Sequence, residues 1–140
     1  MSSSAIARRF FDEVFSKGKL DLVDELFAPD YIGHPSGPEQ ATRGPSGVKE
    51  YVAGLRTAVS DLSVRVEDQV TEGDKVVTRW SARGTHDGDL MGIAPTGRTA
   101  AVTGITIQRL KDGRVVEGWT SWDLMGLLQQ LAAAPTPSRS

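Results

Sequence analysis

The sequence predicts an α+β fold in which three N-terminal helices pack on a curved antiparallel sheet of about four strands. Apolar residues recur at helical spacing through residues 4–60, and they alternate at a period of two from residue 62 onward. The dipeptide Asp112-Gly113, which favours tight hairpins, separates two of the alternating segments. Helices that precede hairpin-linked strands indicate that the two kinds of element form separate layers.

Residues 4–17 are predicted to form the first helix, because their apolar side chains fall on one helical face. The segment DLVDELF, residues 21–27, predicts a short second helix on the same grounds. Pro45 suits the first turn of a third helix, which is predicted over residues 45–60. The Gly- and Pro-rich segment PDYIGHPSGPEQATRGPSG, residues 29–47, is expected to form a long irregular connection of the kind that borders a cavity.

Four strands are predicted, over residues 62–70, 76–86 and 98–110 and from the Asp112-Gly113 turn to about residue 123. On the second of them, Trp80 and His86 share the parity that faces the interior. On the last, Trp119 and Asp123 share a face, and Trp122 is expected to point to the opposite one. Leucines at helical spacing after Asp123 indicate one or two final helical turns.

The composition indicates one domain. A chain of 140 residues, 39% of them hydrophobic, is long enough for one core, so a single domain is predicted over residues 1–133, followed by a disordered tail of residues 134–140. A formal net charge of −2 with scattered Lys and Arg argues against nucleic-acid and membrane-surface binding. The absence of cysteine excludes disulfides and thiolate chemistry.

No apolar run approaches the ~20 residues of a membrane span, so a cytoplasmic protein is expected.

The stretch VVEGWTSWDLMGLLQQL places one acid, Asp123, between two indoles and a run of leucines. An Asp directly before an apolar run is typical of a helix N-cap, which contributes about 1 kcal/mol. The same acid in an apolar pocket could instead transfer protons. A helix N-terminus lowers a carboxyl pKa whereas burial raises it, so the two interpretations predict opposite shifts. The residues alone leave both open.

The two histidines are the other catalytic candidates. His86 follows a strand whose inward parity includes Trp80, so it could donate a hydrogen bond to a substrate oxygen, or it could be exposed at the strand end. His34 lies in the long connection, where a histidine can be functional or merely exposed. Together with one carboxylate they match an iron facial triad in number, but no pair has close ligand spacing, so no metal site is predicted.

Four segments, in order, carry a family resemblance. They are FFDEVFSKGKLDLVDELFAPDYIGH, GPSGVKEYVAGLRTA, GDKVVTRWSARGTHDGDLMGIAPTGR and DGRVVEGWTSWDLMGLLQQL, and they cover most of residues 6–131. This ordered set resembles the SnoaL-like polyketide cyclases, which have the NTF2-like cone-shaped α+β fold. His34 matches the family's DYxxH-like segment, and Gly118 stands where many relatives carry histidine.

The resemblance implies a cofactor-free intramolecular aldol ring closure of a polyketide ester in a deep apolar cavity. It implies that Asp123, at the end of the last long strand, is the acid/base. It also implies a hydrophobic small-molecule substrate and a homodimer or larger homo-oligomer, because relatives commonly pack their sheets face to face. The substrate-binding candidates are Trp80, Trp119, Tyr51, Leu55, Met91 and Gln108.

Two other functions remain open from the sequence. An epoxide hydrolase on the same fold would need a second acid and an arginine beside Asp123, and Arg98 or Arg109 could supply the arginine. A non-catalytic binder of hydrophobic ligands would keep the cone without the chemistry, and Gly118 in place of a polar residue favours it slightly.

Overall fold

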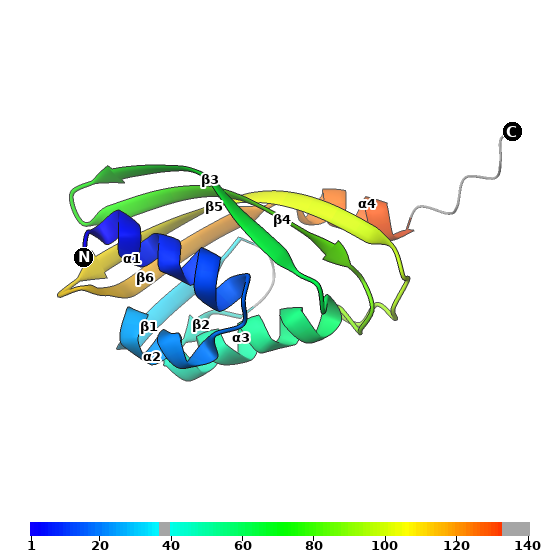
Figure 1. Cartoon of the computed structure of the whole chain (residues 1–140), viewed down its shortest axis with the longest axis horizontal. Coiled ribbons are helices and arrows are strands. Elements are labelled where there is room, and N and C mark those ends of the chain that lie inside the picture. The colour runs from blue at the N-terminus through cyan, green and yellow to red at the C-terminus, as the bar shows by residue number, and fades with distance from the viewer. Residues whose placement is uncertain (37–39, 133–140) are drawn as a thin grey trace, which may run out of the picture.

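A curved sheet forms one layer of the molecule, and helices cover one of its faces (Figure 1). The computed structural model describes residues 1–36 and 40–132, and in these residues the sheet has six strands in the order β2-β1-β6-β5-β4-β3. The strands are β1 (Phe27–Pro35), β2 (Thr42–Arg43), β3 (Ser63–Glu72), β4 (Lys75–Thr85), β5 (Thr99–Lys111) and β6 (Arg114–Trp122). Strands β1 and β6 are parallel, and the other neighbouring pairs are antiparallel.

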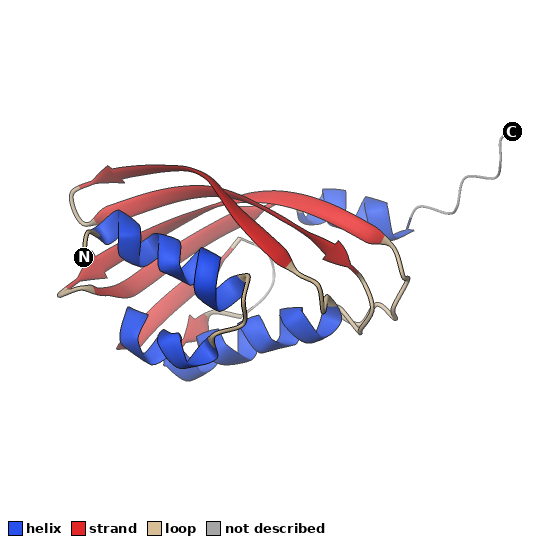
Figure 2. Ribbon diagram, viewed as in Figure 1, coloured by secondary structure: helices blue, strands red, loops and turns tan. Residues whose placement is uncertain are grey.

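The helices are α1 (Ser3–Arg9), α2 (Val23–Leu26), α3 (Gly44–Ala58) and α4 (Leu124–Ala132). A π-helical segment, Phe10–Phe15, continues α1, and a 3-10 turn, Leu20–Leu22, leads into α2. Figure 2 shows α1, α2 and α3 together on one side of the sheet, whereas α4 lies near one end of it. Helix α4 packs against β5. The three helices predicted before residue 60 therefore exist, and the predicted final turns form a fourth helix.

The α+β class is confirmed, but the prediction of about four strands is wrong. The described chain has two more, β1 and β2, within the segment that was expected to be an irregular connection. Prolines and glycines interrupt the alternation of β1, and its main partner is β6, about 85 residues away in the sequence. A local pattern cannot report such a pairing. Residues 133–140, which include the predicted disordered tail, lie outside the described residues.

An extra residue in β6 decides which of its side chains face the helices. Leu110 pairs with Val115 and Arg109 pairs with Glu117, so Val116 has no partner on β5. Such a β-bulge reverses the alternation beyond it. Val115 is buried, and after the bulge the even-numbered Gly118 lies on the same inner face as its buried partner Gln108.

The predicted inward face of the last strand is therefore wrong. Trp119 and Asp123 were expected to face the interior, but Trp119 pairs with Ile107 on the outer face. Thr120 and Trp122 line the interior instead. The prediction assigned the odd-numbered residues Trp119 and Asp123 to the interior, but the bulge at Val116 places the even-numbered residues of β6 there.

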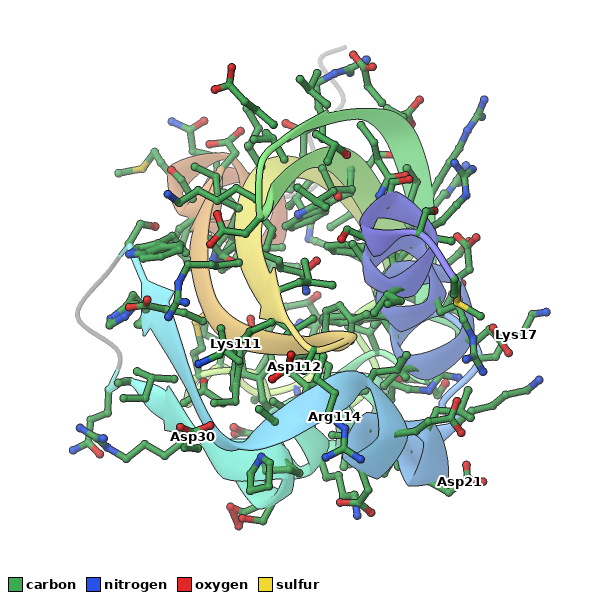
Figure 3. The ribbon with its side chains drawn as sticks, turned by 90° about the vertical axis from the view of Figure 1, so that its left-hand side faces the viewer. Lys17, Asp21, Asp30, Lys111, Asp112 and Arg114 are labelled. Atoms are coloured by element: carbon green, nitrogen blue, oxygen red, sulfur yellow. The ribbon has the colours of Figure 1, made fainter. Side chains whose placement is uncertain are left out.

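Figure 3 looks onto the end of the molecule where the β5–β6 hairpin lies, and the strands curve around interior side chains. The labelled side chains of Asp30, Asp112 and Arg114 are exposed at this end. Asp112 has a positive φ of 53°, and Gly113 follows with 78°, as the tight hairpin requires. Within the part of the chain that the structure describes, no helix is both long and apolar enough to cross a membrane.

Arg56 ties α3 to the end of the π-helical segment, and its loss should destabilise the fold. Its Nη1 donates to the carbonyl oxygens of Phe15 and Ser16 at 2.9 and 2.8 Å. We expect Arg56→Met to lower the free energy of unfolding by about 2 kcal/mol, because these half-buried carbonyls lose a charged donor. Urea unfolding measures the change. Arg8→Met, which removes only an exposed pair with Asp12, is the control and should have little effect; equal losses in both variants would contradict the prediction.

Candidate active site

A cavity of about 370 Å³ lies between the sheet and the helices. Most of its wall is aromatic or aliphatic, with side chains such as Phe15, Leu55, Val64, Trp122 and Leu127. Among the described residues that line it there is no Asp or Glu. The volume is within the range of small-molecule sites. The lining also includes the exposed Arg83, so the cavity suits a hydrophobic guest that is recognised by a few polar groups.

The first polar group of the cavity is a hydrogen-bonded row across three strands. The Trp80 indole Nε1 donates to Thr106 Oγ1 at 3.0 Å, and Thr106 Oγ1 is 3.0 Å from Thr120 Oγ1. Gly104 makes this possible, since a Cβ there would lie 2.3 Å from the Trp80 ring. The absence of a side chain at Gly104 lets the indole lie across β5. The row is internally satisfied and positions Trp80 as a wall of the cavity.

His86 is the second polar group, and it is 1% exposed. The backbone N–H of Thr96 donates to His86 Nδ1 at 3.3 Å, and Thr96 Oγ1 lies 3.0 Å from the same nitrogen. Because Nδ1 accepts a backbone N–H, the proton of the neutral ring is on Nε2. Nε2 has no hydrogen-bond partner among the described residues, and His86 lines the cavity. The structure thus offers an unused N–H donor to a guest, and the alternative of an exposed strand-end histidine is wrong.

Gln108 is the third polar group, and it is 2% exposed. Its Oε1 likewise has no partner in the described chain. Gln108 pairs with Val76 near the start of β4, whereas His86 lies just past the end of that strand. The two unpartnered groups therefore lie toward opposite ends of the same long strand. Buried polar atoms of this kind are costly unless a ligand or water pairs with them.

Asp123 does not project into the cavity, so its predicted position is wrong. The residue is exposed and is not part of the cavity wall. Its Oδ1 accepts from the backbone N–H of Gly126 at 2.8 Å, which is the N-cap geometry of α4. Strand β6 ends at Trp122 and α4 begins at Leu124, so Asp123 lies directly before the first residue of the helix. A proton-transfer role for Asp123 has no geometric support here and stays a prediction.

His34 reaches the rim of the cavity, but its imidazole belongs to a cluster on the outer face of the sheet. Its Nε2 is 2.8 Å from Glu117 Oε2, and its ring stacks on Trp119 at 5.6 Å between centroids. Arg109 Nη2 donates to Glu117 Oε1 at 3.2 Å. The hydrogen bond from His34, and then the contacts from Arg109, hold the pKa of Glu117 below its usual value.

The structure brings together five of the six predicted substrate-binding residues around the cavity, namely Trp80, Tyr51, Leu55, Met91 and Gln108. Trp119, the sixth, lies on the outer face beside His34. Sequence reasoning missed Thr106, Thr120 and Tyr31, which also line the cavity. The parity of the third predicted strand already placed Thr106 with Gln108, and that signal could have found it.

The three catalytic candidates do not form one constellation. His86 is buried in the cavity, His34 faces the outer side of the sheet, and Asp123 is exposed at the start of α4. No group of three or more potential metal-ligating side chains occurs among residues 1–36 and 40–132.

The sequence of this chain is similar to those of known polyketide cyclases. The model of the SnoaL-like polyketide cyclase family matches residues 5–131. The chain is 29% identical over 121 residues to nogalonic acid methyl ester cyclase of Streptomyces nogalater, a match that covers 84% of this chain and 88% of the relative. It is 30% identical to an aklanonic acid methyl ester cyclase of Streptomyces peucetius, with 98% and 97% of the two chains covered.

Solved structures of two proteins with about 30% sequence identity have the same fold as this chain. TsrD from Streptomyces laurentii superposes with a TM-score of 0.82 at 30% identity, covering 94% of this chain and 95% of that one. A candidate SnoaL-like polyketide cyclase from Jannaschia sp. CCS1 superposes with a TM-score of 0.86 at 29% identity, covering 95% and 93%.

The outer-face cluster predicts an acid-dependent loss of stability. Because the pKa of Glu117 is lowered on folding from its ordinary 4.5, the carboxylate stabilises the fold above that pH, and the contribution is lost as the pH falls through the folded value. We expect wild type to melt above Glu117→Gln at pH 7 and this advantage to disappear below pH 4.5. Thermal unfolding from pH 7 to pH 3 measures it, with the exposed Glu72→Gln as control. A constant difference across the range would contradict the assignment.

Proposed function

Since the chain belongs to the SnoaL-like polyketide cyclase family, we propose that it closes a ring in a hydrophobic polyketide ester by a cofactor-free intramolecular aldol reaction. The observation that carries the proposal is the unpartnered Nε2–H of His86, a residue that lines a mostly apolar cavity. A donor fixed in a water-poor site is suited to an oxygen on which negative charge develops. The fixed tautomer supports this role, because Thr96 donates to Nδ1 and leaves the proton on Nε2.

The proposed reaction is an isomerisation of the substrate. The carbon between two carbonyls of the substrate loses a proton to one of the carbonyl oxygens, which gives the enol. The same carbon then attacks a second carbonyl carbon of the same molecule. One C–C bond forms, and the attacked C=O becomes an alcohol. His86 Nε2–H donates a hydrogen bond to that oxygen as negative charge develops on it, and the proton released by the enol reaches the oxygen through water, so His86 keeps its own proton. Because the described cavity wall has no carboxylate, positioning and oxyanion stabilisation supply most of the rate in this proposal.

The absence of an acid from the described cavity wall favours one alternative, a protein that binds a hydrophobic ligand without chemistry. It would use the same cavity and the same two unpartnered groups. The epoxide hydrolase hypothesis gains no support, because Arg109 is paired with Glu117 on the outer face and Asp123 is exposed. Turnover separates the cyclase from the binder.

The donor role of His86 can be tested with two amides of different length. His86→Asn can keep a contact to Thr96 but cannot reach the Nε2 position, whereas the longer His86→Gln places an N–H there. We expect His86→Asn to lower kcat by roughly 100-fold and His86→Gln to retain more of it. Conversion of nogalonic and aklanonic acid methyl esters, followed by chromatography, measures both. Equal rates in wild type and His86→Asn, with all proteins folded, would overturn the role.

The two interpretations of Asp123 also separate by substitution. Asp123→Asn keeps a good N-cap and removes the charge, so we expect its turnover to stay within a few-fold of wild type. Asp123→Ala removes the cap and should cost about 1 kcal/mol in urea unfolding. A large loss of turnover in a fully stable Asp123→Asn would restore this acid as the acid/base and refute its assignment as a helix cap alone.

We also propose that the outer face of the sheet is the interface of a homodimer. Ile105, 46% exposed, lies on this face near Trp119. We expect Ile105→Glu to convert a dimer into a monomer in light scattering coupled to size exclusion, because it places a charge in an apolar contact. Met125→Glu, on exposed α4, is the matched control and should leave the mass unchanged. A monomeric wild type would refute the interface.

A further inference from the structure

The Tyr31 hydroxyl occupies space that two glycines leave open. Gly33 on β1 pairs with Gly118 on β6, and a Cβ at either position would lie 2.6 or 2.8 Å from this oxygen. Neither glycine has the positive φ that would require glycine for backbone reasons. The space for the phenol is therefore what the two glycines provide. The Tyr31 ring is held edge-on against Phe27, with centroids 4.8 Å apart.

Gln108 lies on β5, the strand beside Gly118. It pairs with Gly118, so Gly33, Gly118 and Gln108 form one row across three adjacent strands on the inner face. Tyr31 and Gln108 both line the cavity. Gln108 Oε1 lacks a partner, and the hydrogen bonds of the described residues include none to the Tyr31 hydroxyl. An unused O–H donor and an unused amide oxygen thus belong to residues on either side of Gly118 in the cavity wall.

The phenol remains a donor at all physiological pH values. Burial, with smaller effects from Tyr51 and Glu117, raises the pKa of Tyr31 to about 12. A phenol of this kind does not act as a base near neutrality. Its available chemistry is to donate a hydrogen bond to an uncharged or partly charged oxygen.

We propose that the Tyr31 hydroxyl and the Gln108 amide form a binding site for an oxygenated edge of the substrate, in which Tyr31 donates to a carbonyl oxygen and Gln108 Oε1 accepts from a neighbouring hydroxyl. This deepens the proposed function and rests on it. His86 lies toward the opposite end of β4, so the site fixes the end of the substrate that does not react. The ligand chemistry is a hydroxyl beside a carbonyl on a flat apolar framework. Tyr31 is then a substrate contact that sets binding and leaves the chemical step unchanged.

Tyr31→Phe removes only the hydroxyl and tests the contact directly. We expect KM for aklanonic acid methyl ester to rise roughly 5-fold with kcat unchanged, because a neutral hydrogen bond to a non-reacting oxygen is lost equally from ground state and transition state. The dissociation constant, measured by quenching of tryptophan fluorescence, should rise by the same factor. The melting temperature should not fall. An unchanged KM and dissociation constant, or a loss confined to kcat, would overturn the proposal.

Gly118→Ala tests the same contact from the other side. In wild type the new Cβ displaces the Tyr31 oxygen and should raise KM, but in the Tyr31→Phe background that oxygen is absent, so the added effect should disappear. Gly54→Ala, on α3 with open space around it, is the control and should leave KM unchanged. Equal penalties of Gly118→Ala in both backgrounds would overturn the proposal.

Failure of the cyclase proposal can be told apart from failure of the Tyr31 proposal. If wild type binds the ester without converting it, the cyclase proposal falls, and the ratio of the Tyr31→Phe and wild-type dissociation constants still decides the role of Tyr31. If wild type binds neither aklanonic nor nogalonic acid methyl ester, the site as stated for this ligand class is refuted as well.

Discussion

The extra residue at Val116 is the constraint on which the site depends. A strand that kept a period of two from Val115 would turn Glu117 and Trp119 toward the helices. The bulge turns Gly118, Thr120 and Trp122 inward instead. It therefore keeps a carboxylate out of the cavity and gives the inner face two small residues and one indole. Glu117 and Trp119 are left on the outer face by the same step, where His34 of β1 contacts both.

Small residues on the inner face let large neighbours cross the sheet. Gly104 admits the Trp80 indole, which then reaches Thr106, and Gly33 with Gly118 admits the Tyr31 hydroxyl. In each case a side chain from one strand occupies the space above another. The cavity wall is thus built from side chains that lie along the sheet and leave a hollow between the sheet and the helices.

The polar groups of the cavity differ in whether they are satisfied. Trp80, Thr106 and Thr120 bond to one another, so they can shape the wall at little energetic cost. His86 Nε2 and Gln108 Oε1 are buried without partners in the described chain, which is costly in a protein that holds no guest. A guest with complementary oxygens removes that cost. His86 and Gln108 therefore keep hydrogen-bonding capacity for a guest, whereas Asp123 already accepts the backbone N–H of Gly126.

The sequence by itself determined the α+β class, the helices, the hairpin at Asp112-Gly113 and most of the apolar cavity wall, because each depends on periodicity or turn chemistry within a short segment. It also carried the family resemblance, since that rests on residues in order along the chain. Only the tertiary structure decided that β1 pairs with β6 and that His86 is buried at the cavity wall with its proton on Nε2. It also decided that Asp123 caps a helix outside the cavity. These outcomes depend on one unpaired residue and on contacts between distant segments, and a local pattern contains neither.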